Sequence, residues 1–244
     1  MSAQMTPPSA QDGRFLPDLA HVRAVLFDFD GTLVDTERLI LESMMRVLDE
    51  EAPGRFRPED IRRNLGLTLD AQLRLYFPGR TDEEYARLAA RYREDHERRF
   101  AEGVRVFPGV PELLRALKEA GIPAAVVTNR HRRTLEFGVH KLGLAPCFAT
   151  LVAYQDVERH KPDPEPILAA LARLEVPPTH ALMVGDQPED RLAAKGAGVH
   201  FAWAGWNPLA RTNADGDHAP VFPTPRDLLI TLFPLREGGS SAFC

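Results

Sequence analysis

The sequence is poor in cysteine and contains no metal-binding histidine pattern. Only two of its 244 residues are cysteines, Cys147 and Cys244, and they form no CxxC pair or other pairing pattern. The eight histidines contain no HxH or HExxH pairing, so the sequence does not support a zinc site. A chain of this length buries enough surface to fold without disulfides. These features favour a reducing compartment such as the cytoplasm.

Long hydrophobic runs and an excess of positive charge are also lacking. No apolar run approaches the roughly 20 residues that a membrane span requires. Residues 1–20 include Gln4, Gln11, Asp12 and Arg14, which interrupt the continuous apolar segment of a signal peptide. The formal net charge of -5 argues against a general nucleic-acid binder. We therefore expect a cytoplasmic protein with no nucleic-acid or membrane partner, and a flexible N-terminal tail over residues 1–20.

Five short apolar runs are typical of β-strands, and helical patterns separate most of them. The runs lie at about residues 22–28, 123–128, 148–154, 181–185 and 199–203. Helices are expected to begin near Pro111, Asp163 and Thr224. This alternation predicts an α/β fold in which a parallel sheet carries helices on both faces.

The long gap between the first and second apolar runs contains helical patterns and no convincing strand. Thr81 and Glu84 form a capping box at the start of one such helix. The same helix carries Tyr92 and His96, and its periodicity favours a core-facing seam over a binding face. We expect a catalytic core at 21–35 and 108–236, interrupted by a small all-helical cap domain at 36–107. An insert at this place can act as a lid over the site.

The most informative stretch is an apolar run that ends in two aspartates one residue apart. Asp28 and Asp30 are followed at once by Gly31 and Thr32. Side chains alternate along a strand, so the two carboxylates would point the same way. Because such carboxylates repel each other, they require a cation or a bound proton nearby. The pattern indicates a divalent-metal site or a nucleophile beside an acid/base.

Other expected strands end in polar residues in the same way. These residues are Thr128, Asn129 and Arg130 after the second strand, Lys161 after the third, and Asp186 and Asp190 after the fourth. Ligands of open parallel sheets lie beyond the carboxyl ends of the strands, so we expect all these groups on one rim. A single strand-end aspartate is often only a helix N-cap. Agreement among four strand ends is much harder to attribute to chance.

Acids, a hydroxyl, an amide and a lysine on one rim are suited to the transfer of a phosphoryl group. Ligand sets made only of oxygen suit Mg²⁺, which also takes a substrate phosphate oxygen. A metal-bridged carboxylate can attack phosphorus and form an aspartyl-phosphate. A lysine and a hydroxyl can neutralise and orient the other phosphate oxygens. A second carboxylate can protonate the leaving alkoxide and then activate water.

The order Asp-x-Asp-Gly-Thr, Thr-Asn, Lys-Pro and Gly-Asp-x-x-x-Asp resembles the haloacid dehalogenase-like (HAD) hydrolase superfamily. The resemblance extends over about residues 22–235, and the helical insert resembles the cap of the phosphoglycolate-phosphatase-like branch. It implies a Rossmann-like core, dependence on Mg²⁺ and a covalent phospho-aspartate. The dehalogenase branch itself lacks an acid at the position of Asp30, so a phosphate ester is favoured over a carbon–halogen bond.

The resemblance also implies a role for each motif residue. Asp28 would be the nucleophile and a metal ligand, and Asp30 would be the acid/base with its backbone carbonyl on the metal. Lys161 would pair with the phosphate and with Asp28. Asp186 would bind Mg²⁺, and Asp190 would support it directly or through water. The residues expected to contact the substrate are Gly31, Thr32, Thr128, Asn129 and Arg130.

Several residues keep two interpretations at this point. Arg130 and His131 either contact the leaving group or begin a solvated helix. Arg62 and Arg63, in a glycine-containing cap loop, either bind a substrate carboxylate or second phosphate, or are solvated. Gln187 stands where serine is common in the family, and we expect it to change only the hydrogen bonds around the last motif.

Three functions remain open. The first is a phosphatase that acts on a small phosphorylated metabolite, phosphoglycolate-like or broader. The second is a β-phosphoglucomutase-type phosphotransferase or a pyrophosphatase on the same fold, although the cap has no clear lysine and arginine pattern for a mutase. The third is a non-catalytic binding protein, which the presence of all the acidic motifs and Lys161 argues against. The sequence leaves the choice between monomer and homodimer open.

Overall fold

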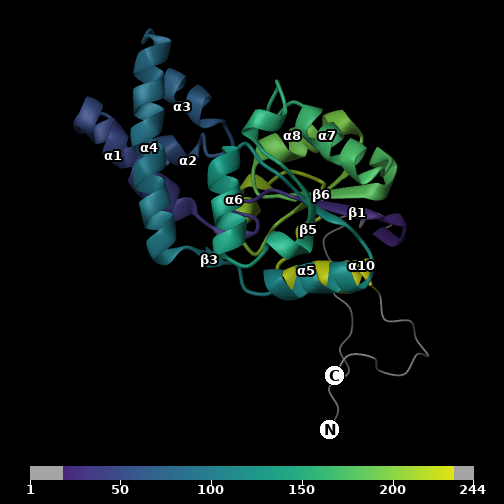
Figure 1. Ribbon diagram of the computed structural model, residues 1–244. Helices are drawn as coiled ribbons and strands as arrows, with labels where there is room; N and C mark the ends of the chain where they lie inside the picture. The colour runs from purple at the N-terminus through teal and green to yellow at the C-terminus, as the bar shows by residue number, and fades with distance from the viewer. Residues whose placement is uncertain (1–18, 234–244) are drawn as a thin grey trace.

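A computed structural model describes residues 19–233 as a sheet core with a helical unit beside it (Figure 1). The core sheet has five parallel strands in the order β5-β4-β1-β6-β7. The strands are β1 (Ala24–Phe27), β4 (Ala124–Val127), β5 (Phe148–Val152), β6 (Ala181–Gly185) and β7 (His200–Trp203). Each coincides with one of the predicted apolar runs, so the predicted parallel sheet is confirmed.

Helices cover both faces of this sheet because side chains alternate along each strand. In β1, Val25 and Phe27 belong to one hydrophobic cluster, and Leu26 belongs to another on the opposite face. The first face is covered by α5 (Val110–Glu119), α6 (Arg132–Lys141) and α10 (Pro225–Leu232). The second is covered by α7 (Glu165–Leu174), α8 (Pro188–Ala197) and α9 (Pro208–Asn213). Figure 1 shows α7 and α8 above the sheet and α5 and α10 below it.

Residues 37–103 form four helices with a hydrophobic cluster of their own, and we call this unit the cap. Its helices are α1 (Glu37–Glu51), α2 (Pro58–Arg62), α3 (Leu69–Tyr76) and α4 (Asp82–Gly103). Its cluster includes Met44, Leu48, Ile61, Leu73 and Leu88. The predicted capping box is confirmed, because Thr81 Oγ1 accepts from the Glu84 backbone at 3.3 Å and the Glu84 carboxylate accepts from the Thr81 backbone at 2.8 Å.

Two short strands that the sequence did not predict lie where the cap joins the core. They are β2 (Val34–Asp35) and β3 (Arg105–Val106), which pair antiparallel with Val34 opposite Val106. The expectation that 36–107 contains no strand was therefore wrong for β3. A two-residue strand has too little periodicity to be recognised in a sequence. The pairing holds the entry and exit of the cap together, directly after the turn that contains the first aspartates.

The remaining short elements are 3-10 turns at Leu19–His21, Ala145–Cys147, Tyr154–Asp156 and Pro178–His180. Residues 1–18 of the predicted tail and residues 234–236 of the predicted core lie outside the described residues. Leu19, at the end of the predicted tail, is buried with 4% of its surface exposed. Within residues 19–233, no helix combines the length and the apolar character needed to cross a membrane.

Candidate active site

The strand order places three motif-bearing strand ends next to one another. β4, β1 and β6 are adjacent in the sheet, and Thr128, Asp28 and Asp186 follow directly after them. Asp190 lies in the first turn of α8, and Lys161 approaches from the segment before α7. Of the sequence-predicted site residues, Asp28, Asp30, Gly31, Thr128, Asn129, Arg130, Lys161, Asp186 and Asp190 all border one cavity. The structure thus brings together residues that are separated by up to 162 positions in the chain, from Asp28 to Asp190.

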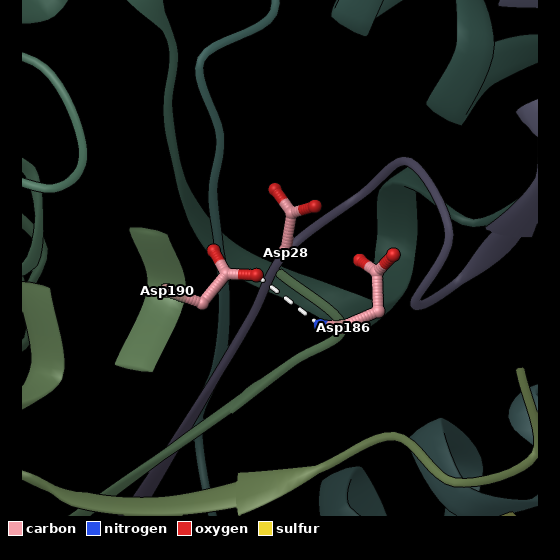
Figure 2. A group of neighbouring side chains, drawn as sticks. All are labelled: Asp28, Asp186 and Asp190. Atoms are coloured by element: carbon pink, nitrogen blue, oxygen red, sulfur yellow. Dashed lines mark hydrogen bonds between the residues drawn. The ribbon is translucent and has the colours of Figure 1, made fainter. Parts of the chain in front are cut away.

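Three buried carboxylates converge at this edge of the sheet. Asp28, Asp186 and Asp190 each offer an oxygen atom, and these atoms all lie within 4.8 Å of one another. Figure 2 shows the three side chains gathered around one point, with Asp190 bonded to the backbone nitrogen of Asp186. All three residues are buried, with exposed fractions of 6% or less. Such a group of oxygen atoms has the composition of a Mg²⁺ site.

Lys161 links two of these carboxylates. Its Nζ donates to Asp28 Oδ1 at 2.7 Å, to Asp190 Oδ1 at 2.6 Å and to the carbonyl of Val127 at 2.9 Å. The three N–H groups of the ammonium are therefore all used. Asp190 Oδ2 accepts from the backbone nitrogens of Asp186 (3.2 Å) and Gln187 (3.1 Å). Asp190 thus ties the start of α8 to the lysine and fixes both.

The site carries more negative charge than its lysine neutralises. Burial raises the pKa of Asp28 to about 7, with Asp190 and Asp30 adding to the effect and Lys161 opposing it. Burial and the charges of Asp28 and Asp190 raise the pKa of Asp186 well above its ordinary range. Burial alone would lower the pKa of Lys161, but contact with Asp190 and Asp28 raises it, so the lysine stays charged. A buried excess of negative charge calls for a further cation.

Asp186 is oriented by side chains from three different segments. Its Oδ1 accepts from Thr32 Oγ1 at 3.2 Å, and its Oδ2 accepts from Gln187 Nε2 at 2.6 Å and Asn207 Nδ2 at 3.2 Å. Gln187 is held in turn by Asn213, whose Nδ2 donates to Gln187 Oε1 at 3.3 Å. This agrees with the expectation that Gln187 changes the hydrogen bonds of the last motif. Thr32, predicted to contact the substrate, is fully buried behind Asp186 and does not border the cavity.

Asn207 and Trp206 are two residues that the sequence did not single out. Asn207 Nδ2 donates to the carbonyl of Gly31 at 2.8 Å as well as to Asp186, and Trp206 Nε1 donates to the carbonyl of Thr32 at 2.8 Å. Both therefore fix the turn after β1. Asn207 also caps α9, since its Oδ1 accepts from the Leu209 backbone at 3.0 Å. The Asn-Pro pair at the start of α9 was a recognisable N-cap signal, but it did not reveal the contact with the turn.

Glycine is required at position 31 for two independent reasons. Its backbone has a φ of +78°, which side-chain-bearing residues rarely adopt. A Cβ atom at this position would also collide with the carboxylate of Asp186. The turn after β1 and the carboxylate of Asp186 can therefore approach each other only because residue 31 has no side chain.

Asn129 connects the core to the cap. Its Nδ2 donates to the carbonyls of Lys161 and Gly66, both at 2.9 Å, and its Oδ1 accepts from the Lys161 backbone at 3.0 Å. The side-chain amide is therefore engaged with the chain itself. Thr128, its neighbour, borders the cavity and accepts from the Arg130 backbone at 3.2 Å through Oγ1.

Arg130 is buried and paired with Asp30. Only 7% of its side chain is exposed, and Nη1 donates to both oxygens of Asp30, at 2.9 and 3.2 Å. The interpretation of Arg130 as part of a solvated helix start is therefore wrong. His131 borders the cavity as well, and burial together with Arg93 and Arg133 lowers its pKa.

The cavity lies between the cap and the sheet edge and has a volume of about 320 Å³. The cap contributes mainly apolar side chains, among them Ile40, Leu65, Leu67 and Ala89. Tyr92 and His96 of α4 also border it, although they were expected only to face the interior of the insert. A helical face that packs inward and one that borders a cavity have the same periodicity, so the sequence did not distinguish them.

Arg62 and Arg63 do not border this cavity. Arg62 pairs with Glu37 at 2.8 Å and Glu59 at 3.2 Å, and the Arg63 side chain is 77% exposed with Asp60 at 3.6 Å. Both arginines are exposed and paired with carboxylates of the cap, as the solvated interpretation expects. The same loop does reach the site through Gly66, whose backbone accepts from the core.

Comparison with known proteins agrees with this site. The sequence model of the family described as haloacid dehalogenase-like hydrolase matches residues 25–204. Pyrophosphatase PpaX from Bacillus velezensis is 38% identical over 185 residues, which cover 76% of this chain and 84% of that protein. CbbY from Rhodobacter sphaeroides, solved in complex with phosphate, is 25% identical with a TM-score of 0.76, covering 86% of this chain and 99% of that one. A Lactobacillus plantarum structure with the provisional name phosphoglycolate phosphatase is 26% identical with a TM-score of 0.75, at the same coverage.

The parallel sheet, its acidic edge and the names of these relatives all point to phosphoryl chemistry, so the protein is a hydrolase of the phosphatase class. More particularly, the chain belongs to the haloacid dehalogenase-like hydrolase family, whose sequence model covers most of the sheet core and the whole cap. The resemblance inferred from four short motifs is thereby confirmed.

Proposed function

We propose that this protein is a Mg²⁺-dependent phosphatase that hydrolyses the phosphomonoester of a small metabolite through an aspartyl-phosphate on Asp28. The observation that carries the proposal is the position of Asp28. Its carboxylate is buried, bonded to Lys161 at 2.7 Å, close to two further carboxylates and open to the cavity. A carboxylate held at a fixed point beside a permanent cation is well placed for in-line attack on phosphorus.

The donor set fits Mg²⁺. Asp28, Asp186 and the backbone carbonyl of Asp30 would hold the ion, and Asp190 would support it through the backbone of Asp186. All donors are oxygen atoms, and the buried excess of negative charge supports a divalent cation at this point. When bound, Mg²⁺ supplies positive charge that offsets repulsion between the nucleophile and the phosphate oxygens.

Each motif residue then has a defined task in the reaction. Asp28 attacks phosphorus, and the bond between phosphorus and the leaving oxygen breaks while Asp30 gives that oxygen its proton. Lys161 and the Thr128 hydroxyl stabilise the charge on the remaining phosphate oxygens. Asp30, now deprotonated, takes a proton from the water that attacks the aspartyl-phosphate. Inorganic phosphate leaves and Asp28 is regenerated.

The cavity favours a small substrate, because about 320 Å³ must hold both the phosphate and its leaving group. The names of the relatives support two candidates. Phosphoglycolate-type esters are the first, and pyrophosphate is the second, since a protein named pyrophosphatase is 38% identical to this chain. A mutase remains a further alternative on the same fold, because it would use the same nucleophile.

The test is release of inorganic phosphate from phosphoglycolate, pyrophosphate and a set of sugar and alkyl phosphates, with Mg²⁺ and with a chelator in its place. We expect Mg²⁺-dependent release with one clear preference. Asp28→Asn should lower turnover by at least about 1,000-fold while the protein stays folded. Asp49→Asn, an identical change at an exposed position of α1, serves as the matched control and should leave turnover unchanged.

Three results would contradict the proposal. Turnover by Asp28→Asn above about a tenth of the wild-type rate would exclude the nucleophile assignment. Equal rates with Mg²⁺ and with the chelator would exclude the metal. Isomerisation of a hexose phosphate without release of phosphate would favour the mutase.

A further inference from the structure

Arg130 makes unusually few hydrogen bonds for a buried arginine. Its side chain is 7% exposed, and Nη1 contacts Asp30 at 2.9 and 3.2 Å. The other two nitrogens, Nε and Nη2, are buried and have no hydrogen-bond partner within residues 19–233. Buried donors of a charged group are costly when unpaired, so the surroundings of these nitrogens need an explanation.

Two aromatic rings explain how the buried nitrogens of Arg130 are accommodated. The guanidinium carbon lies 5.0 Å from the ring centre of Phe100 and 5.6 Å from that of Phe29. The rings are nearly parallel, with an interplanar angle of 20° and centres 6.4 Å apart. Cation–π attraction stabilises a guanidinium in such surroundings. We call Phe29 and Phe100 the aromatic seat, which holds the guanidinium and leaves Nη1 directed at Asp30.

The aromatic seat is assembled from both parts of the fold. Phe29 stands between the two aspartates of the first motif, and Phe100 belongs to α4 of the cap. Gly138 of α6 makes room for both rings, because a Cβ there would lie 2.9 Å from Phe29 Cζ and 3.1 Å from Phe100 Cζ. The contact of 2.9 Å with the buried ring of Phe29 would force a shift and so displace the seat. The position of Arg130 is therefore set by the packing of these two rings.

Asp30 depends on this arrangement. Its side chain is 20% exposed, and among the described residues Arg130 provides the side-chain hydrogen bonds that its carboxylate accepts. Without Arg130 the carboxylate could rotate freely between rotamers at the cavity wall. Proton transfer to a leaving oxygen needs a carboxylate held within hydrogen-bond reach of that oxygen.

We infer that Arg130, fixed in the aromatic seat, is the positioning residue for Asp30. The inference rests on the proposed function, since it assumes that Asp30 protonates the leaving group. In this role Arg130 acts through Asp30, and no direct contact with the substrate is required. Arg130 should therefore matter only where the leaving oxygen needs a proton.

The leaving group separates this role from a general structural one. An alkoxide must be protonated as it departs, whereas p-nitrophenolate is stable enough to depart without a proton. The parameter kcat/KM reports the steps up to formation of the aspartyl-phosphate and excludes the later attack of water. We expect Arg130→Met to lower kcat/KM for an alkyl phosphate with an uncharged leaving group by about 100-fold. For p-nitrophenyl phosphate we expect a fall of less than about threefold.

Two further variants make the test specific. Arg130→Lys keeps a cation that can reach Asp30 and should restore part of the alkyl phosphate rate. Arg133→Met is the matched control, because Arg133 lies three residues after Arg130 at the start of α6, is 76% exposed and pairs with Glu97 of the cap. It should leave the ratio of the two kcat/KM values unchanged. If Arg130→Met does not fold, Gly138→Ala disturbs the aromatic seat without removing a charge and should shift the ratio in the same direction.

The other outcomes overturn the inference. An equal loss on both substrates would make Arg130 a general structural residue, and no loss on either would make it dispensable. A loss confined to substrates with an anionic leaving group, such as phosphoglycolate and pyrophosphate, would mean that Arg130 binds the substrate directly. Absence of phosphate release by the wild-type protein from every substrate would overturn the proposed function and, with it, this inference.

Discussion

His96 should make the folded protein sensitive to acid. Its ring is 3% exposed, lies parallel to Tyr92 at 5.5 Å and contacts Phe100 at 6.0 Å. Burial, reinforced by the charge of Arg130, lowers the pKa of His96 from 6.5 to about 3, although Asp30 opposes the effect. The folded protein therefore keeps His96 neutral at pH values where the unfolded chain protonates it.

The sign of the effect follows from proton binding. Above about pH 6.5 neither state binds the proton, so His96 makes no difference to the free energy of unfolding. Between pH 6.5 and 3 the unfolded chain binds it and the folded protein does not, so stability falls as the pH falls. The slope approaches 1.4 kcal/mol per pH unit, which gives a loss of about 2 kcal/mol between about pH 7 and pH 5. At pH 5 the folded protein is still unprotonated at His96, so this loss does not depend on the exact lower pKa.

The assay is urea unfolding followed by circular dichroism at about pH 7 and pH 5, on the wild type and on His96→Gln. The variant lacks the titrating ring, so its loss of stability between these two pH values should be smaller by about 2 kcal/mol. His140→Gln, at an exposed position of α6, is the control and should behave as the wild type does. Equal pH dependence in the wild type and His96→Gln would refute the reasoning.

The remaining predictions concern the site itself. Asp186→Asn should raise the Mg²⁺ concentration needed for half-maximal phosphate release or abolish release, and an unchanged Mg²⁺ titration would exclude Asp186 as a ligand. Gly31→Ala should lower kcat/KM by at least about tenfold, because its Cβ collides with Asp186. Gly54 has a similar φ of +70°, but a Cβ there meets no atom of the described residues within 4 Å, so Gly54→Ala should leave kcat/KM unchanged. Equal rates in these two variants would show that the collision is unimportant. Gly66→Ala should raise KM, because its Cβ would strike the Glu189 side chain at the contact between cap and core. Gly103→Ala is its control, because a Cβ there meets no atom within 4 Å in the part of the chain that the structure describes. Equal KM values would argue against the contact at Gly66.

The acidic edge of the sheet was predictable because each of its residues stands at the end of a strand. Parallel strands bring their carboxyl ends to one edge whatever the lengths of the connections between them. Asp28, Thr128 and Asp186 therefore lie together as expected, and Lys161, from the segment between β5 and α7, lies beside them. The apolar runs and the helix signals at Pro111 and Thr224 gave the order of elements for the same reason, since each is a local pattern.

Contacts made by loops were not predictable. Trp206 and Asn207 reach the carbonyls of Thr32 and Gly31 from more than 170 positions away, and their directions depend on the path of the chain after β7. The burial of Arg130 was not predictable either, because it requires one aromatic ring from the cap and another from the core. Arginine is usually exposed, so residue type alone could not distinguish the buried Arg130 from the exposed Arg62.

The central claim is that Asp28 is the residue that receives the phosphoryl group. It is tested most directly by acid-quenching the enzyme during turnover and mapping covalent phosphate by peptide mass spectrometry. Asp30→Asn with p-nitrophenyl phosphate is the combination of choice. This leaving group departs without a proton from Asp30, whereas loss of the base that activates water should let the intermediate accumulate. The account predicts phosphate on the peptide that contains Asp28, at the Asp28 carboxylate, and none in Asp28→Asn. Phosphate on another residue, or rapid release of phosphate from a substrate without any labelled aspartate, would contradict it.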